Sequence, residues 1–206
     1  DDVSLVPQYS SVLPSDTDTF TELSDNLNLK IPLMSSAMDT VTESKMAIEI
    51  SKLGGIGVIH RNLSIEKQVM EIKKVKRNNY LVGAAIGVNS KDFERAEELF
   101  KAKTDLIVID TAHGHTQKVL NMIRKIKKKL KNCTLCAGNI ATGEAAKFLA
   151  DSGVDIVKVG IGPGSICTTR LVAGIGVPQL SALLDVKKAL KNYETKIISD
   201  GGIKFS

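Results

Sequence analysis

The chain has 206 residues, of which 43% are hydrophobic and 25% charged, the composition of an ordinary globular protein. The formal net charge is +5, but the lysine runs carry helical apolar spacing without interleaved aromatic residues, which argues against a nucleic-acid-binding surface. Three cysteines, with no signal peptide and no long apolar span, predict a cytoplasmic protein without disulfides or membrane segments. Tryptophan is absent and aromatic residues make up only 4%, so we expect an aliphatic core.

Short apolar runs alternate with amphipathic segments along the whole chain. Strands are expected at residues 31–35, 56–60, 81–86, 106–110, 134–138, 156–160 and 196–200. Helices are expected at residues 43–53, 64–79, 92–103, 119–130, 144–152 and 181–192. Ser64 and Ser90 are predicted to cap two of these helices, and either Thr142 or Gly143 is expected to begin the helix at residues 144–152. Most strands show little polar alternation, which is typical of parallel strands that are buried on both faces.

This alternation fits two α/β folds, a doubly wound sheet or a (β/α)8 barrel. Polar clusters follow the carboxyl end of nearly every predicted strand, at residues 35–39, 60–62, 110–113, 138–139, 160–167 and 200–202. A barrel gathers all such ends at one mouth, whereas an open sheet focuses ligands at one switch point. We therefore expect a TIM barrel, with seven of its eight strands in a single domain over residues 1–206.

The loop after the sixth predicted strand is the most informative segment. Gly160, Gly162 and Gly164 allow the backbone to approach a ligand and to aim N–H groups at an anion. The alternative is a tight turn in which Cys167 is a small buried residue. Polar neighbours argue against that burial, and Arg170 would favour a thiolate. We predict that Cys167 is a catalytic nucleophile.

Two further clusters at strand ends suit a nucleotide. Asp200 followed by Gly201 and Gly202 offers a carboxylate for ribose hydroxyls beside a backbone that a phosphate can approach, although a plain turn is the alternative. Residues 110–115 read Asp-Thr-Ala-His-Gly-His, but no third cluster of metal ligands lies nearby in sequence. Contacts with a cofactor are therefore favoured over a metal site there.

Cys133 and Cys136 have the spacing of a redox or zinc motif, but no second pair exists. We interpret them as two independent cysteines. The sequence also lacks a GxGxxG turn after a strand, so any dinucleotide would bind at the barrel mouth instead.

Taken together, these segments resemble the family of inosine-5′-monophosphate dehydrogenase and its close relative guanosine-monophosphate reductase. The matching stretches are residues 2–7, 35–43, 54–60, 82–85, 110–115, 138–139, 160–170, 174–179 and 200–203. The Asp-Thr-Ala-His-Gly-His run, residues 38–43 and Val177 before Pro178 favour the dehydrogenase, since the reductases usually differ there. A GMP reductase and a non-catalytic nucleotide-binding barrel remain the alternatives.

The resemblance implies NAD-dependent oxidation of inosine 5′-monophosphate (IMP) to xanthosine 5′-monophosphate. Cys167 would form a covalent thioimidate with C2 of the purine, and Thr169 would position or activate the water that hydrolyses it. The substrate-binding residues implied in this way are Ser36, Met38, Asn139, Ser165, Asp200 and Gly202. The residues implied for the NAD cofactor are Asp110, Thr111 and His113. Backbone carbonyls of Gly162, Gly164 and Cys167 resemble the family's potassium site, and the family usually assembles as a homotetramer.

The sequence departs from the family pattern in two places. Only residues 78–80 link Arg77 to Leu81, where most relatives carry a regulatory pair of cystathionine-β-synthase-type domains. The chain also stops before an eighth strand and before the mobile flap of the family. We expect the 206 residues alone to show no turnover.

Overall fold

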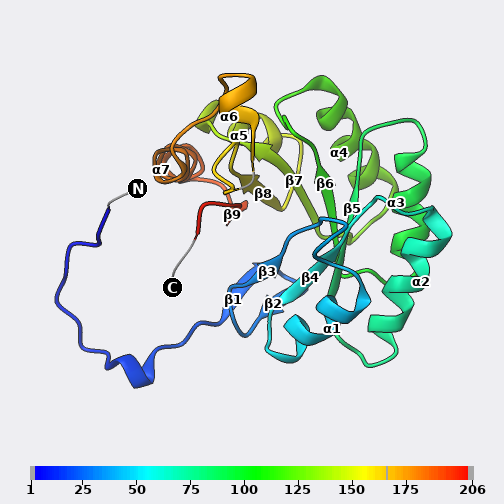
Figure 1. Ribbon diagram of the computed structural model, residues 1–206, viewed down its shortest axis with the longest axis horizontal. Helices are drawn as coiled ribbons and strands as arrows, with labels where there is room; N and C mark the ends of the chain where they lie inside the picture. Colours follow the sequence, from blue (N-terminus) through cyan, green and yellow to red (C-terminus); the bar gives the residue numbers. More distant parts are fainter. Residues whose placement is uncertain (1–2, 166, 204–206) are drawn as a thin grey trace.

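The computed structural model describes residues 3–165 and 167–203. Seven parallel strands form one curled sheet whose order in space follows the order in the chain (Figure 1). These strands are β3 (Met34–Ser35), β4 (Ile56–Ile59), β5 (Val82–Ile86), β6 (Leu106–Asp110), β7 (Leu135–Ile140), β8 (Ile156–Val159) and β9 (Lys196–Ser199). The parallel order and the curl confirm the prediction of a partial TIM barrel.

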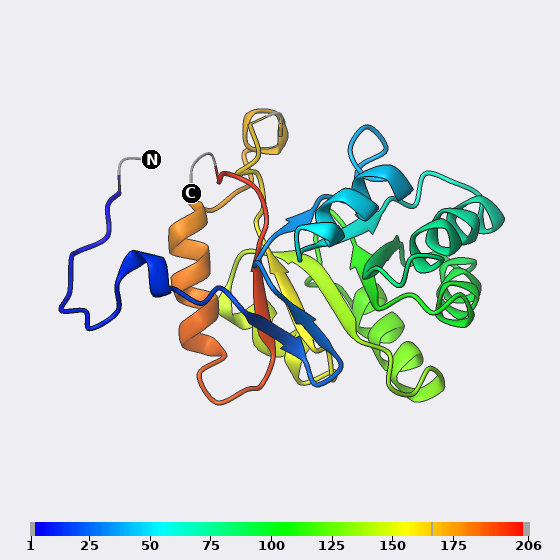
Figure 2. The ribbon, with the colours of Figure 1, turned by 90° about the horizontal axis from the view of Figure 1, so that it is seen from below.

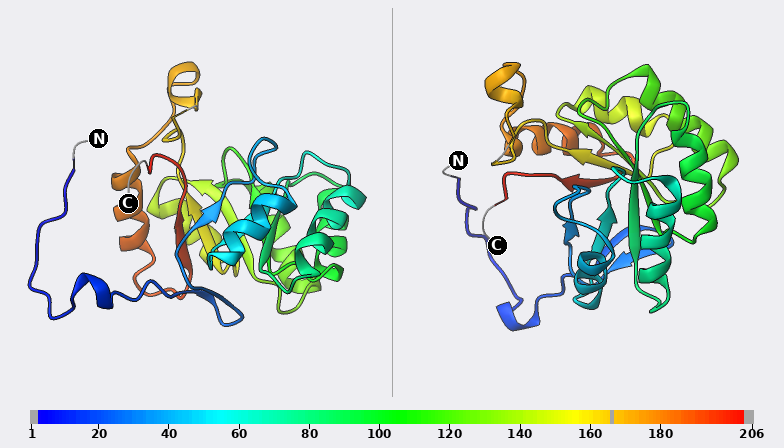
Figure 3. Two further views of the ribbon diagram at one scale, coloured as in Figure 1. Left: turned by 60° about the horizontal axis from the view of Figure 1, so that its bottom comes forward. Right: turned by 45° about the vertical axis from the view of Figure 1, so that its right-hand side comes forward.

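Helices lie between successive strands and cover the outer face of the sheet (Figure 1). They are α1 (Ser44–Lys52), α2 (Ile65–Lys76), α3 (Asp92–Lys101), α4 (Gln117–Lys129), α5 (Gly143–Ala150) and α7 (Gln179–Ala189). The short α6 (Thr169–Val172), which the sequence did not predict, belongs to a loop that stands away from the rest of the molecule (Figure 3). No helix of the described residues is long and apolar enough to cross a membrane.

Alternating side chains of the strands divide the core into two parts. In β6, Ile107 and Ile109 point outward and join the buried cluster under the helices, whereas Leu106 and Val108 belong to a second cluster inside the barrel. Successive side chains of a strand point to opposite faces, so one run of apolar residues fills both layers. The absence of polar alternation in these strands therefore has a direct structural cause.

A hairpin of β1 (Thr21–Ser24) and β2 (Leu27–Leu29), absent from the predicted elements, adds residues to the inner cluster. Leu23, Leu27 and Leu29 are buried there, and the Ser24 hydroxyl lies 3.0 Å from that of Thr134, at the amino end of β7. The two strands have only four and three residues, too short for periodicity to reveal. The segment before the hairpin runs along the outside of the molecule (Figure 2).

Several predicted boundaries were wrong for local reasons. β3 is shorter than the expected strand because the Leu33 N–H donates to the Ile31 carbonyl in a turn (2.8 Å). α7 begins at Gln179 rather than after residue 181, since Pro178 ends the preceding extended segment.

The predicted cap at Ser90 was also wrong. Lys91 precedes α3 without a side-chain cap, and the Asp92 carboxylate instead accepts from the N–H of Asn89 (2.8 Å). The caps at Ser64 and Thr142 are confirmed, each with a side-chain oxygen 3.2 Å from a first-turn N–H.

Candidate active site

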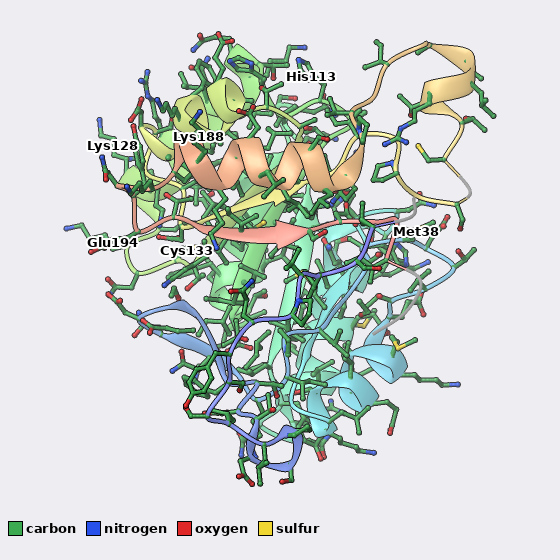
Figure 4. The ribbon with its side chains drawn as sticks, turned by 90° about the vertical axis from the view of Figure 1, so that its left-hand side faces the viewer. Met38, His113, Lys128, Cys133, Lys188 and Glu194 are labelled. Atoms are coloured by element: carbon green, nitrogen blue, oxygen red, sulfur yellow. The ribbon has the colours of Figure 1, made fainter. Side chains whose placement is uncertain are left out.

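A cavity of about 360 Å³ lies at the carboxyl ends of the strands. Its lining includes most of the predicted site residues, namely Ser36, Met38, Asp110, Thr111, Asn139, Gly162, Cys167, Thr169 and Asp200. In Figure 4, Met38 lies at the end toward which β9 points, whereas Cys133 and Glu194 lie at the opposite end. The parallel topology thus collects side chains from β3, β6, β7, β8 and β9 at one mouth.

A neighbouring cavity of about 400 Å³ continues into the barrel interior between β3 and β9 and shares four lining residues with the first, Ser36, Ala37, Lys158 and Asp200. Most of its remaining lining is apolar, with Leu23, Leu29 and other aliphatic side chains. The polar chemistry is therefore concentrated in the smaller, outer cavity.

The Cys167 thiol is half-buried in the outer cavity, where its sulfur lies 3.2 Å from the Thr169 hydroxyl. As a thiol, Cys167 donates to this hydroxyl oxygen; the hydroxyl, followed by the backbone N–H of Thr169, lowers the pKa of Cys167 because both donate to the thiolate once it forms. α6 begins at Thr169, which places that hydroxyl and N–H beside the sulfur. A thiol in such surroundings is suited to nucleophilic attack.

Arg170 stabilises the Cys167 thiolate less than we expected from the sequence. Its positive charge also lowers the pKa of Cys167, but by less than the Thr169 hydrogen bond. The guanidinium donates to the Val177 carbonyl (2.6 Å), and an added Cβ at Gly162 or Gly176 would lie 2.6 Å from its Cγ. The main contribution of Arg170 in this geometry is therefore to close the loop around the two glycines.

Lys158 is the site residue that sequence reasoning missed. Its ammonium lies 2.9 Å from Asp110 Oδ1 and 2.8 Å from Asp200 Oδ2, and its side chain is only 14% exposed. Burial disfavours the charge on Lys158, but the two carboxylates outweigh it and raise the pKa of Lys158. Burial likewise opposes ionisation of Asp200, but Lys158 and Asn139 hold its pKa below the ordinary value. The available signal was a lysine at an inward-facing position of an apolar strand.

Asn139 lies at an irregularity in the β7–β8 register, where Gly138 and Ile140 pair with consecutive residues of β8. Its Nδ2 donates to the Gly160 carbonyl and to Asp200 Oδ2, both at 2.7 Å. Its Oδ1 is buried and has no hydrogen-bond partner among the described residues. A buried acceptor without a donor is costly, so this oxygen is available to a ligand N–H or O–H group.

Thr111 and His113, which were expected at the cofactor together with Asp110, do not both present their side chains to the cavity. The Thr111 hydroxyl donates to the Gly138 carbonyl (2.7 Å), so it holds the β6 and β7 loops together. His113 is exposed and does not line the cavity, and its ring is edge-on to His115 at 6.3 Å. His115 packs in turn against Phe148 at 4.7 Å.

Ser165 and Gly202 are exposed and lie outside the cavity lining, but the structure brings their loops together. Gly201 and Gly202 have φ values of +81° and +76°. A Cβ at Gly201 would lie 3.2 Å from the Gly164 nitrogen, and one at Gly202 would lie 3.2 Å from Pro163 Cβ. Two glycine-rich turns thus lie close together, with the Pro163 ring next to Gly201 and Gly202, and turns of this kind can form the backbone cradle that binds anions.

The donors expected for potassium are backbone carbonyls of the same loop. The Gly164 carbonyl accepts from the Cys167 N–H (3.0 Å), which leaves one of its two lone pairs for a cation. Carbonyl oxygens are the ligands that potassium sites use, so the donor chemistry fits. Among the described residues, no group of three His, Cys, Asp or Glu side chains forms a metal site.

Cys133 and Cys136 are free and buried, one in the outer and one in the inner cluster. This confirms the interpretation of two independent cysteines. Burial raises the pKa of each thiol to about 12, so neither resembles Cys167.

The comparisons with known proteins cover the whole chain. Residues 1–206 match the family model described as "IMP dehydrogenase / GMP reductase domain". Relatives named inosine-5′-monophosphate dehydrogenase include those of Borreliella burgdorferi, 47% identical, and Cryptosporidium parvum, 43% identical. A relative of the same name from Streptococcus pyogenes serotype M3 is 37% identical.

All of this chain is covered in each comparison, but it spans only 63%, 62% and 68% of the three relatives, respectively. The alignment with the Streptococcus protein extends over 334 positions against 206 residues here, so that relative contains residues without a counterpart in this chain.

Proposed function

Because the chain belongs to the IMP dehydrogenase / GMP reductase family, we propose that it carries the reactive thiol and nucleotide site of an NAD-dependent IMP dehydrogenase. The observation that supports this most directly is the cavity that Cys167 lines together with Thr169, Asp110 and Asp200, with the Cys167 sulfur hydrogen-bonded to Thr169. A thiol of lowered pKa beside polar groups that suit ribose hydroxyls is what covalent chemistry on a nucleotide requires.

In this proposal the Cys167 thiolate forms a C–S bond to C2 of the hypoxanthine ring. Loss of a hydride from C2 leaves a thioimidate on the sulfur, and water then breaks the C–S bond to release xanthosine 5′-monophosphate and the thiol. When bound, NAD would supply the acceptor for that hydride. The Thr169 hydroxyl, 3.2 Å from the sulfur, stabilises the thiolate and is close enough to orient the attacking water.

The substrate would lie between β3 and the loops after β7, β8 and β9. Asp200 and Asn139 Oδ1, which has no partner in the described part of the chain, would accept hydrogen bonds from the nucleoside, while Ser36 and Met38 would line the opposite wall. The Gly202 turn and the Ser165 loop, which lie close together, would hold the phosphate.

The cofactor would lie on the β6 side of the same mouth. Asp110 lines the cavity there, Thr111 holds the loop, and the exposed His113 follows two residues further along the chain. A potassium ion bound by the carbonyls of Gly162, Gly164 and Cys167 would hold the loop in shape. The homotetramer rests on the resemblance alone and stays a prediction.

The thiol is tested in the complete protein with Cys167→Ala. We expect NADH formation from IMP to fall by about 10⁴-fold or more while IMP still binds, since only the covalent step is removed. Cys133→Ala, which removes a buried thiol outside the cavity, should leave turnover unchanged. In protein quenched during turnover, mass spectrometry should find the nucleotide on the peptide that contains Cys167.

The alternatives give different results in the same assays. A GMP reductase would consume NADPH with GMP and form no NADH from IMP. A non-catalytic binding protein would bind IMP without turnover, and Cys167→Ala would change nothing. Normal NADH formation by Cys167→Ala would overturn the covalent mechanism.

A further inference from the structure

The Lys158 ammonium donates hydrogen bonds to both carboxylates of the site, and in each case to only one of the two carboxylate oxygens. Its ammonium contacts Asp110 Oδ1 at 2.9 Å and Asp200 Oδ2 at 2.8 Å. Within the described part of the chain, Asp110 Oδ2 and Asp200 Oδ1 accept no hydrogen bond. Each carboxylate therefore keeps one oxygen without a hydrogen bond among the described residues, and both residues line the cavity.

A glycine in the neighbouring strand allows the Lys158 side chain to extend as far as Asp110. Gly138 pairs with Asp110 on one side and with Lys158 on the other, so it stands between them in the sheet. Neighbouring strands are about 4.8 Å apart, and the lysine side chain must span two strands to reach Asp110. A Cβ at Gly138 would lie 2.7 Å from Lys158 Cβ, so the missing side chain leaves the path open.

Other partly buried lysine–aspartate pairs of this chain lie at the amino ends of strands. Lys76 contacts both oxygens of Asp105 at 2.9 and 2.8 Å, and one of these also accepts from the Val82 N–H. Lys127 contacts Asp155, which also accepts from a strand N–H, that of Leu135. In both pairs the carboxylate accepts a hydrogen bond from a backbone N–H at a strand end away from the cavity. These pairs therefore stabilise the fold and do not contribute to the site.

We propose that Lys158 is a positioning residue that fixes Asp110 and Asp200 with one ammonium, so that cofactor binding and substrate binding depend on the same side chain. The inference rests on the proposed function, because Asp110 and Asp200 are there assigned to the cofactor and to the substrate. Without the ammonium, both carboxylates lose the group that holds them in place, and their mutual repulsion would raise their pKa values or turn them away from each other.

Among residues 3–165 and 167–203, few charged or titratable groups lie beside Lys158. Asp110 comes from β6 and Asp200 follows β9, and Asn139 of β7 is polar but does not titrate. The Cys136 thiol of β7 lies behind the lysine, and burial raises its pKa to about 12, so it stays neutral near pH 7. Arg61 and Cys167 are on the cavity wall without a direct contact to Lys158 among the described residues.

The test compares Lys158→Met, Lys158→Arg and the control Lys76→Met in the complete protein. For Lys158→Met we expect KM for both IMP and NAD to rise, and to rise further as the pH falls. Below a raised carboxyl pKa, the ionised fraction and hence the affinity fall about tenfold per pH unit. Lys158→Arg should restore both values, and Lys76→Met should lower the melting temperature without changing either KM. If Lys158→Met does not fold, Lys158→Gln takes its place.

Unchanged KM values, or a rise in only one of them, would overturn the proposal. If the wild-type protein forms no NADH from IMP, the proposed function fails. The role of Lys158 is then tested by a measurement that needs no substrate. Titration of the aspartate carboxyl carbons by ¹³C NMR should then show a higher pKa for Asp110 or Asp200 in Lys158→Met than in Lys158→Arg. Equal carboxyl pKa values in the two variants would refute the role of Lys158.

Discussion

The sulfur of Cys167 lies 3.2 Å from the hydroxyl of Thr169, two residues further along the chain at the start of α6. This hydrogen bond is the largest contribution to the lowered pKa of the Cys167 thiol. Reactivity of the thiol is therefore set mainly by a neighbour in sequence, once α6 has formed.

Replacing Thr169 by valine should raise the pKa of Cys167, because the thiolate loses its principal hydrogen-bond donor. At a fixed pH below that pKa, a smaller fraction of the thiol is ionised, so alkylation by iodoacetamide slows. The midpoint of the rate–pH profile should move to higher pH in Thr169→Val and return in Thr169→Ser. An unchanged midpoint in the valine variant would show that the hydroxyl does not control the thiol.

The three cysteines should differ sharply in reactivity. Burial raises the pKa of Cys133 and Cys136 to about 12, whereas the half-buried Cys167 has a lowered pKa. Iodoacetamide at pH 7 should modify Cys167 alone in the folded protein, and all three after denaturation, as peptide mass spectrometry would show. Comparable labelling of Cys136 in the folded state would contradict its burial in the barrel.

Gly138→Ala should destabilise the protein by about 2 kcal/mol, because overpacking of a close-packed interior forces the backbone or neighbours to shift. The new Cβ would lie 2.6 Å from the Lys158 carbonyl and 2.7 Å from its Cβ. Urea unfolding measures the change. Gly164→Ala is the matched control, since its nearest contact would be Cys167 Cβ at an ordinary 3.6 Å, and it should unfold like the wild type.

Gly202→Ala should weaken binding of IMP more than binding of inosine, because the turn that would hold the phosphate needs φ near +76°. A left-handed alanine costs about 1–2 kcal/mol, which corresponds to about a tenfold loss of affinity. Calorimetry with both ligands separates the phosphate from the nucleoside. Gly174→Ala has a positive φ of +65° in open space and should leave the IMP-to-inosine ratio unchanged. An equal loss for both ligands would place the turn away from the phosphate.

Much of the candidate site follows from the order of strands and polar clusters in the sequence, because parallel topology sends every strand's carboxyl end to one mouth. Asp110, Asn139, Cys167 and Asp200 were identified from their position after strands, and all four line one cavity. The roles assigned to them remain proposals. His113 followed the same rule but is exposed outside the lining, since position in a loop does not decide which way a side chain points.

The amino-acid sequence is sufficient to specify the barrel, because its unbroken apolar strands and intervening amphipathic helices match a parallel sheet covered by helices. It is also sufficient to identify the candidate thiol, through the glycines and polar residues around Cys167. The contact of Lys158 with both Asp110 and Asp200, in contrast, arises only when the sheet is assembled. That triad depends on the pairing register of β6, β7, β8 and β9, and no local pattern in a chain specifies the register of strands that lie dozens of residues apart.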